Sequence, residues 1–101
     1  MAEETKRVFT VNGKEVRIRP RLPLSEGAKI PELLGKAASD DMRDWIPLFQ
    51  LLLEPCELVA NPADAASYDA LDVFEEVYPL GEAVGNYALS RINAARQAAK
   101  N

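Results

Sequence analysis

The sequence predicts an α+β fold, with an N-terminal β-hairpin at about residues 7–19 followed by a small bundle of three to four α-helices over about 25–98. Two patterns predict it. Apolar and polar residues alternate on both sides of an Asn-Gly pair near the N-terminus, and farther along the chain bulky apolar residues recur at steps of three and four. The length of 101 residues suits a single domain over 1–101, because no linker, repeat or change of composition marks a second one.

The hairpin is centred on Asn12-Gly13, a pair that accepts the positive φ angles of a two-residue type I′ turn. A loop of this length fixes the register. The expected pairs are Val8 with Arg17, Phe9 with Val16, Thr10 with Glu15, and Val11 with Lys14. The apolar face then carries Phe9, Val11, Val16 and Ile18. Because a lone hairpin is barely stable in water, we expect this face to pack on helices or to join a partner's sheet.

Helical periodicity begins after the prolines that end the second strand. Either Ser25 caps the first helix, or Pro31 opens its regular part over 31–38. Ser39-Asp40-Asp41 supplies an oxygen cap for the next helix, which Pro47 either kinks or restarts and which Pro55 ends.

Two further helices are expected in the second half of the chain. Asn61 or Ser67 caps the first of them, and Pro79 separates it from a last helix at roughly 80–98. The expected buried stripe of the first comprises Leu71, Phe74, Val77 and Tyr78. The expected stripe of the last comprises Leu80, Val84, Tyr87, Ala88, Ile92 and Ala95.

The residue inventory argues against an enzyme. The chain has no histidine, which is the commonest general base and a common zinc ligand, and its one cysteine, Cys56, lies between two glutamates. The glycines are scattered rather than gathered in a phosphate-binding loop, and the acidic residues lack the spacing of a calcium loop. We therefore predict no catalytic residues, no metal and no cofactor. We also expect neither a signal peptide nor a membrane-spanning helix.

Charge is unevenly distributed. The chain has a net charge of −4, with basic side chains prevailing in residues 1–21 and 91–101 and acidic ones between them. An acidic body repels phosphate, which makes nucleic acid an improbable partner. An alternative reading is a small regulatory binding module, in which Arg17 and Arg19 on the hairpin dock on nucleic acid or on an acidic protein.

The densest apolar segment, 45–53, predicts a contact surface. Its bulky residues occupy most of a helix circumference, and a small domain encloses such a helix only with difficulty. We name Trp45, Phe49, Leu52 and Leu53 as candidates for contact with a client helix or with another copy of the chain. The competing interpretation, a helix buried at the centre of the core, has equal weight.

A hairpin of the form Phe-x-Val-Asn-Gly-Lys-x-Val at residues 9–16, joined by a proline-rich link to acidic, leucine-rich helices, resembles the small tail assembly chaperones of bacteriophages and prophages. The resemblance implies a non-enzymatic role in the host cytoplasm. Members of that family coat the helical tape measure protein, keep it in solution, help tail tube subunits polymerise around it, and self-associate. A minor structural virion protein, such as a head–tail connector, is the other alternative.

Overall fold

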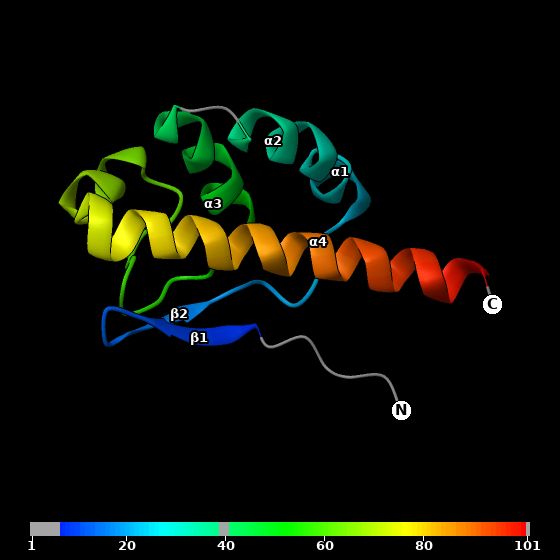
Figure 1. Ribbon diagram of the computed structural model, residues 1–101, viewed down its shortest axis with the longest axis horizontal. Helices are drawn as coiled ribbons and strands as arrows, with labels where there is room; N and C mark the ends of the chain where they lie inside the picture. The colour runs from blue at the N-terminus through cyan, green and yellow to red at the C-terminus, as the bar shows by residue number, and fades with distance from the viewer. Residues whose placement is uncertain (1–6, 39–40, 101) are drawn as a thin grey trace.

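The computed structural model describes residues 7–38 and 41–100, the side chains of residues 99 and 100 aside, and confirms the α+β fold: an antiparallel hairpin followed by helices (Figure 1). The elements in chain order are β1 (Val8–Val11), β2 (Lys14–Arg17), α1 (Leu24–Gly27), α2 (Ile30–Ala37), η1 (Met42–Trp45), α3 (Ile46–Leu52), η2 (Ala65–Ala70), η3 (Val73–Val77) and α4 (Tyr78–Lys100). Elements η1 and η2 are 3₁₀-helices, and η3 is a π-helical turn.

The hairpin has the predicted register in all four pairs. Asn12 and Gly13 adopt φ angles of 52° and 77°, as a type I′ turn requires. The end of β2 and the residues after it are bonded to the end of α3 and the chain that follows: the Arg19 amide donates to the Leu52 carbonyl at 2.7 Å, and the Glu54 amide donates to the Arg17 carbonyl at 2.9 Å. These bonds join the hairpin to the helical part of the molecule.

The long helix α4 extends along the length of the molecule, with the hairpin on one side of it and α1, α2 and α3 on the other in Figure 1. Side chains from the hairpin, α3, the connector after α3, η2 and α4 meet in one core. Its buried members are Val11, Val16, Ile18, Leu48, Phe49, Leu52, Leu53, Leu58, Val59, Tyr68, Leu80, Val84, Tyr87 and Ala88. The apolar face of the hairpin therefore packs on helices of its own chain.

The structure decides between the alternatives that the sequence leaves open for the first helices. Ser25 does not cap α1, whose N-cap position is Pro23, whereas Pro31 lies in the first turn of α2. Pro47 lies in the first turn of α3, so it marks a restart after η1. Asp41 caps η1 by accepting a hydrogen bond from the Arg43 amide at 3.0 Å. The other two residues of the predicted cap, at 39 and 40, lie outside the described residues.

The predicted third α-helix is wrong. Residues 65–70 form η2, capped by Asp64, and residues 73–77 form η3, capped by Asp72. Pro79 does not separate two helices, since η3 continues directly into α4. A proline ring collides with the carbonyl four residues earlier in a regular α-helix, and the wider π-helical turn before Pro79 is suited to this position.

Within the described ranges, no helix is both long enough and apolar enough to cross a bilayer.

Candidate functional site

Three of the four predicted contact residues are in the core. Phe49 and Leu52 are 2% exposed and Leu53 is 3% exposed, so these side chains belong to the core and do not form the broad apolar surface that the sequence predicts. The reason is the shortness of α3, a helix of seven residues, together with its surroundings. The hairpin covers one side of it, with Ile18 paired to Leu53 in an isolated bridge, and α4 covers another. The alternative of a central core helix applies to these three residues.

Trp45 differs from the other three because its indole is only partly buried. The indole Nε1–H donates to the Ala37 carbonyl at 2.7 Å, which satisfies one of the free carbonyls at the end of α2. The ring meets Tyr78 edge to face, with centroids 5.6 Å apart and planes at 77°. Trp45 thereby connects α2, η1 and the first turn of α4.

Gly81 permits the close approach of Trp45 to α4. A Cβ atom at position 81 would lie 2.6 Å from the Cε3 and Cζ3 atoms of the indole, a distance that no real contact tolerates. Gly85, one turn farther along α4, has open space where its Cβ would be. The two glycines therefore have different effects on the surface of α4. Gly81 makes room for the indole of Trp45, and Gly85 leaves open space beside the helix.

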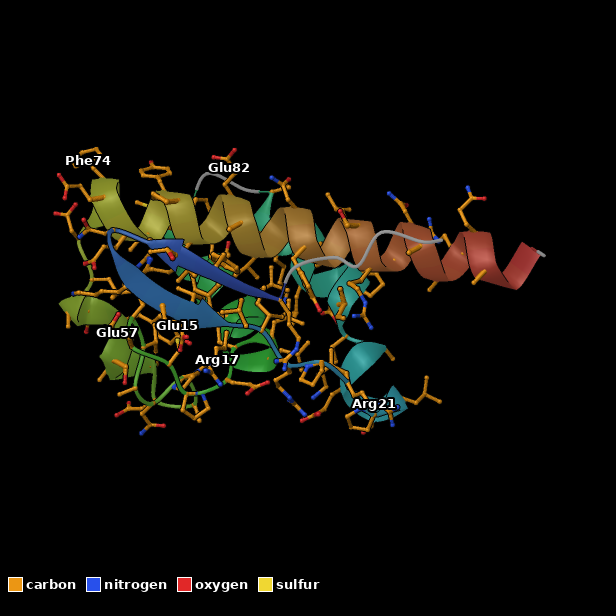
Figure 2. The ribbon with its side chains drawn as sticks, turned by 90° about the horizontal axis from the view of Figure 1, so that it is seen from below. Glu15, Arg17, Arg21, Glu57, Phe74 and Glu82 are labelled. Carbon is orange, nitrogen blue, oxygen red and sulfur yellow. The ribbon has the colours of Figure 1, made fainter. Side chains whose placement is uncertain are left out.

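An apolar groove of about 350 Å³ lies at this junction, between α2, η1, α3 and α4. We call it the Trp45 groove. It is lined by Leu34, Ala37, Ala38, Trp45, Leu48, Phe49, Tyr78, Gly81, Glu82 and Gly85. Most of its lining residues are apolar; Glu82, Tyr78 and Trp45 are the lining residues whose side chains carry a polar atom. Glu82 points away from the body of the molecule (Figure 2). Such a surface offers packing for apolar side chains.

An exposed phenylalanine, Phe74 on η3, contacts Tyr78, so Trp45, Tyr78 and Phe74 form a row of three aromatic rings. Phe74 stacks on Tyr78, with centroids 6.3 Å apart and planes at 21°, and 80% of its surface is exposed. The sequence analysis placed both residues on one helix face, which is correct, but predicted that this face is buried, which is wrong for Phe74 and Tyr78. The spacing of four residues shows that Phe74 and Tyr78 share a face. It does not show whether that face points toward the core or toward solvent.

The two predicted arginines lie away from the Trp45 groove and are engaged by carboxylates. Arg17 Nε donates to Glu15 Oε1 at 2.8 Å, and this hydrogen bond and the charge of Glu15 raise the pKa of Arg17. Arg19 donates to the Leu51 carbonyl at 3.2 Å and to Glu26 Oε2 at 2.9 Å. Figure 2 shows Glu15, Arg17 and Glu57 close together on the outer side of the hairpin. This surface has mixed charge, which disfavours the interpretation as a basic nucleic-acid site.

The remaining reactive groups have structural partners. The Cys56 thiol is half-buried and lies 3.6 Å from the Val59 carbonyl. The buried Tyr68 hydroxyl donates to the Pro62 carbonyl at 2.9 Å, and burial raises the pKa of Tyr68. In the part of the chain that the structure describes, no three His, Cys, Asp or Glu side chains are grouped so that they could hold a metal ion.

Comparison of the chain with protein-family models, with curated proteins and with solved structures finds no match.

Proposed function

We propose that this chain is a non-enzymatic chaperone of phage tail assembly, which binds an apolar helical segment of the tape measure protein in the Trp45 groove. The observation that carries the proposal is the groove itself: an open apolar surface on a protein whose other large apolar side chains mostly meet in one core. Helical clients bind such grooves through apolar side chains spaced three and four residues apart.

The shape of the groove favours a helix as the client. Gly81 and Gly85 leave no side chains of their own on this part of α4, and the open space at Gly85 admits a bulky side chain from outside. Burial of apolar surface supplies the driving force, at about 25 cal/mol per Å². The net charge of −4 would help to keep the complex dispersed in the host cytoplasm, where we place the protein.

The same proposal includes the other expected partners. A chaperone of this kind would release the tape measure protein as tail tube subunits polymerise around it, and it would act as a homo-oligomer. The hairpin module built on Arg17 and Arg19 is not favoured, because Glu15 and Glu26 engage both guanidinium groups. A head–tail connector would differ from a chaperone by remaining in the finished particle.

The test is co-expression with the tape measure protein encoded beside this chain's own gene, with the soluble fraction of the client as readout. Gly85→Leu adds a bulky side chain to the groove at a position where the Cβ atom meets open space, and we expect it to abolish solubilisation of the client. Gly35→Leu is the matched control, since Gly35 also has open space at its Cβ position but lies outside the groove lining. This control variant should behave like the wild type.

Three results would contradict the proposal. The first is a client that stays insoluble with the wild-type chain, and the second is a gene neighbourhood without a long helical protein. The third is a Gly85→Leu variant that solubilises the client as well as the Gly35→Leu variant does.

A further inference from the structure

We propose that copies of this chain associate head to tail, with the Phe74 side chain of one copy inserted into an arginine-rimmed groove at the opposite end of the next. The oligomer proposed above does not specify any surface, and this inference assigns the two surfaces involved. It rests on charge and shape at the two ends of the molecule and does not depend on what the Trp45 groove binds.

The first surface is an acidic end that carries an exposed aromatic ring. Phe74 lies in η3 and is 80% exposed. Three exposed carboxylates flank it in the chain: Asp69, Asp72 and Glu75. The Asp72 carboxylate caps η3 by accepting a hydrogen bond from the Glu75 amide at 2.7 Å. Although Phe74 stacks on Tyr78, most of its ring is open to contact from another molecule.

The second surface is an apolar groove of about 270 Å³ with a basic rim, which we call the Arg21 groove. It lies between the chain after β2, the α1–α2 region and the C-terminal half of α4. Its lining comprises Arg19, Pro20, Arg21, Leu22, Gly27, Ile30, Leu52, Tyr87, Ala88, Arg91, Ile92 and Ala95. Leu22, Ile30 and Ile92 give it apolar walls of the kind that an aromatic ring requires.

The rim of the Arg21 groove carries three arginines, which differ in whether another side chain engages them. Arg19 is engaged by Glu26, and Arg91 donates to the Tyr87 hydroxyl at 3.3 Å. Arg21 is exposed and makes no hydrogen bond or ion pair with any other described residue. Arg21 lies outside any helix, so no helix dipole accounts for its charge.

The two surfaces face opposite ends of the same molecule. Figure 2 shows Phe74 at one end of the long axis and Arg21 toward the other. The rise of α4 separates Phe74 from Arg91 by roughly 25 Å, since they are 17 residues apart in a continuous helical run. One chain thus carries both halves of a complementary pair that it cannot join within itself. A second copy is the occupant that supplies an acidic aromatic end, and the contact repeats from copy to copy.

The first experiment measures association of the full chain by sedimentation velocity over a range of protein concentrations. We expect species larger than a dimer to appear as concentration rises at low salt, and to recede at about 500 mM NaCl because salt screens the ion pairs. A chain that stays monomeric at every concentration and salt level would overturn the proposal. In that case a client protein, rather than a second copy, would be the candidate occupant of the Arg21 groove.

The second experiment separates the two surfaces with one variant each. Phe74→Ser removes the inserted ring and leaves the groove intact, whereas Arg21→Glu reverses the free charge of the groove and leaves the ring intact. Both side chains are exposed, so both variants should fold, as circular dichroism can verify. We expect each variant alone to be monomeric and the equimolar mixture to form a heterodimer that grows no further.

The mixture distinguishes this contact from a symmetric one. If two acidic ends met each other, Arg21→Glu alone would still associate. If two grooves met, Phe74→Ser alone would still associate. Leu89→Ser serves as the control for removal of an exposed apolar side chain from the same helical run, since Leu89 is 51% exposed and lies outside the groove lining. That control should assemble like the wild type. Loss of assembly in it would also overturn the proposal.

Discussion

Two glycines one turn apart on α4 show how a single atom can have opposite effects in neighbouring places. A Cβ at Gly81 would collide with the indole of Trp45, whereas a Cβ at Gly85 would meet open space. A helix with glycine in its interior is less stable than the same helix with alanine, because glycine loses more backbone conformational freedom on folding. Gly85 therefore lowers stability with no packing contact in return, and Gly81 is required by the position of Trp45.

We predict that Gly85→Ala raises the free energy of unfolding by about 0.5–1 kcal/mol, the helix-propensity gain. Gly81→Ala should lower it by about 1–2 kcal/mol, because displacing Trp45 costs more than the same propensity gain returns. Urea denaturation followed by tryptophan fluorescence measures both. Equal stability of the two variants would show that Trp45 does not rest against Gly81.

At the scale of elements, Glu76 joins the hairpin turn to the start of α4. Its Oε1 accepts a hydrogen bond from the Asp72 amide at 2.8 Å, and its Oε2 lies 3.4 Å from Lys14 Nζ. Glu76 is 5% exposed, the one buried charged side chain among the described residues. The Asp72 backbone hydrogen bond, followed by hydrogen bonds from the Asn12 and Lys14 side chains, holds the pKa of Glu76 below its ordinary value.

This arrangement predicts how stability depends on pH. Because the pKa of Glu76 is lower in the folded chain than in the unfolded chain, the carboxylate stabilises the fold fully above the unfolded pKa of about 4.3–4.5. That contribution is lost as the pH falls through the lowered folded pKa. Glu76→Gln should therefore destabilise the protein by about 1–3 kcal/mol at pH 7, and its deficit should shrink below about pH 4.5.

The measurement is the unfolding free energy of the wild type and of Glu76→Gln between pH 3 and pH 7. Glu75→Gln, at the exposed neighbouring position, is the control and should show little loss at neutral pH. A deficit of the Glu76 variant that stays constant across this range would contradict the assignment of the charge as the stabilising feature.

For the whole molecule, the burial of α3 makes its apolar residues a structural requirement. Phe49 packs in the core beside Tyr68, with ring centroids 5.8 Å apart, while Phe74 lies exposed on η3. The two phenylalanines are chemically identical. Their effects on the molecule differ because one is enclosed by the hairpin, the connector and the helices together.

We predict that Phe49→Ala lowers the free energy of unfolding by about 3–5 kcal/mol. Small domains have about 5–15 kcal/mol in total, so this loss is a large fraction of the stability. Phe74→Ala should change the stability by less than about 1 kcal/mol, as is usual at exposed positions. Denaturation followed by circular dichroism compares the two. Comparable losses would contradict the assignment of Phe74 to the surface.

The parts of the structure that the sequence could predict are those decided by neighbouring residues. Asn12-Gly13 determines the hairpin turn, and the two-residue loop then determines the register of all four pairs. The apolar spacing likewise predicts the buried stripe of the last helix, which the structure confirms for Leu80, Val84, Tyr87 and Ala88. The prediction is wrong for Ala95, which is exposed, and Ile92 is only partly buried. Turn conformation and helical periodicity depend on a few neighbouring residues, so both can be predicted without knowledge of the rest of the fold.

Only the tertiary structure decided which apolar residues face inward. Nothing local distinguishes Phe49 from Phe74, because burial depends on elements far away in the chain. The sequence analysis named Trp45 in the candidate site, but it did not find Ala37 and Gly81, which contact Trp45 from two other helices. Gly81 lies 36 positions beyond Trp45. No periodic pattern spans such a separation, so the groove exists only once long-range packing has brought α2, η1 and α4 together.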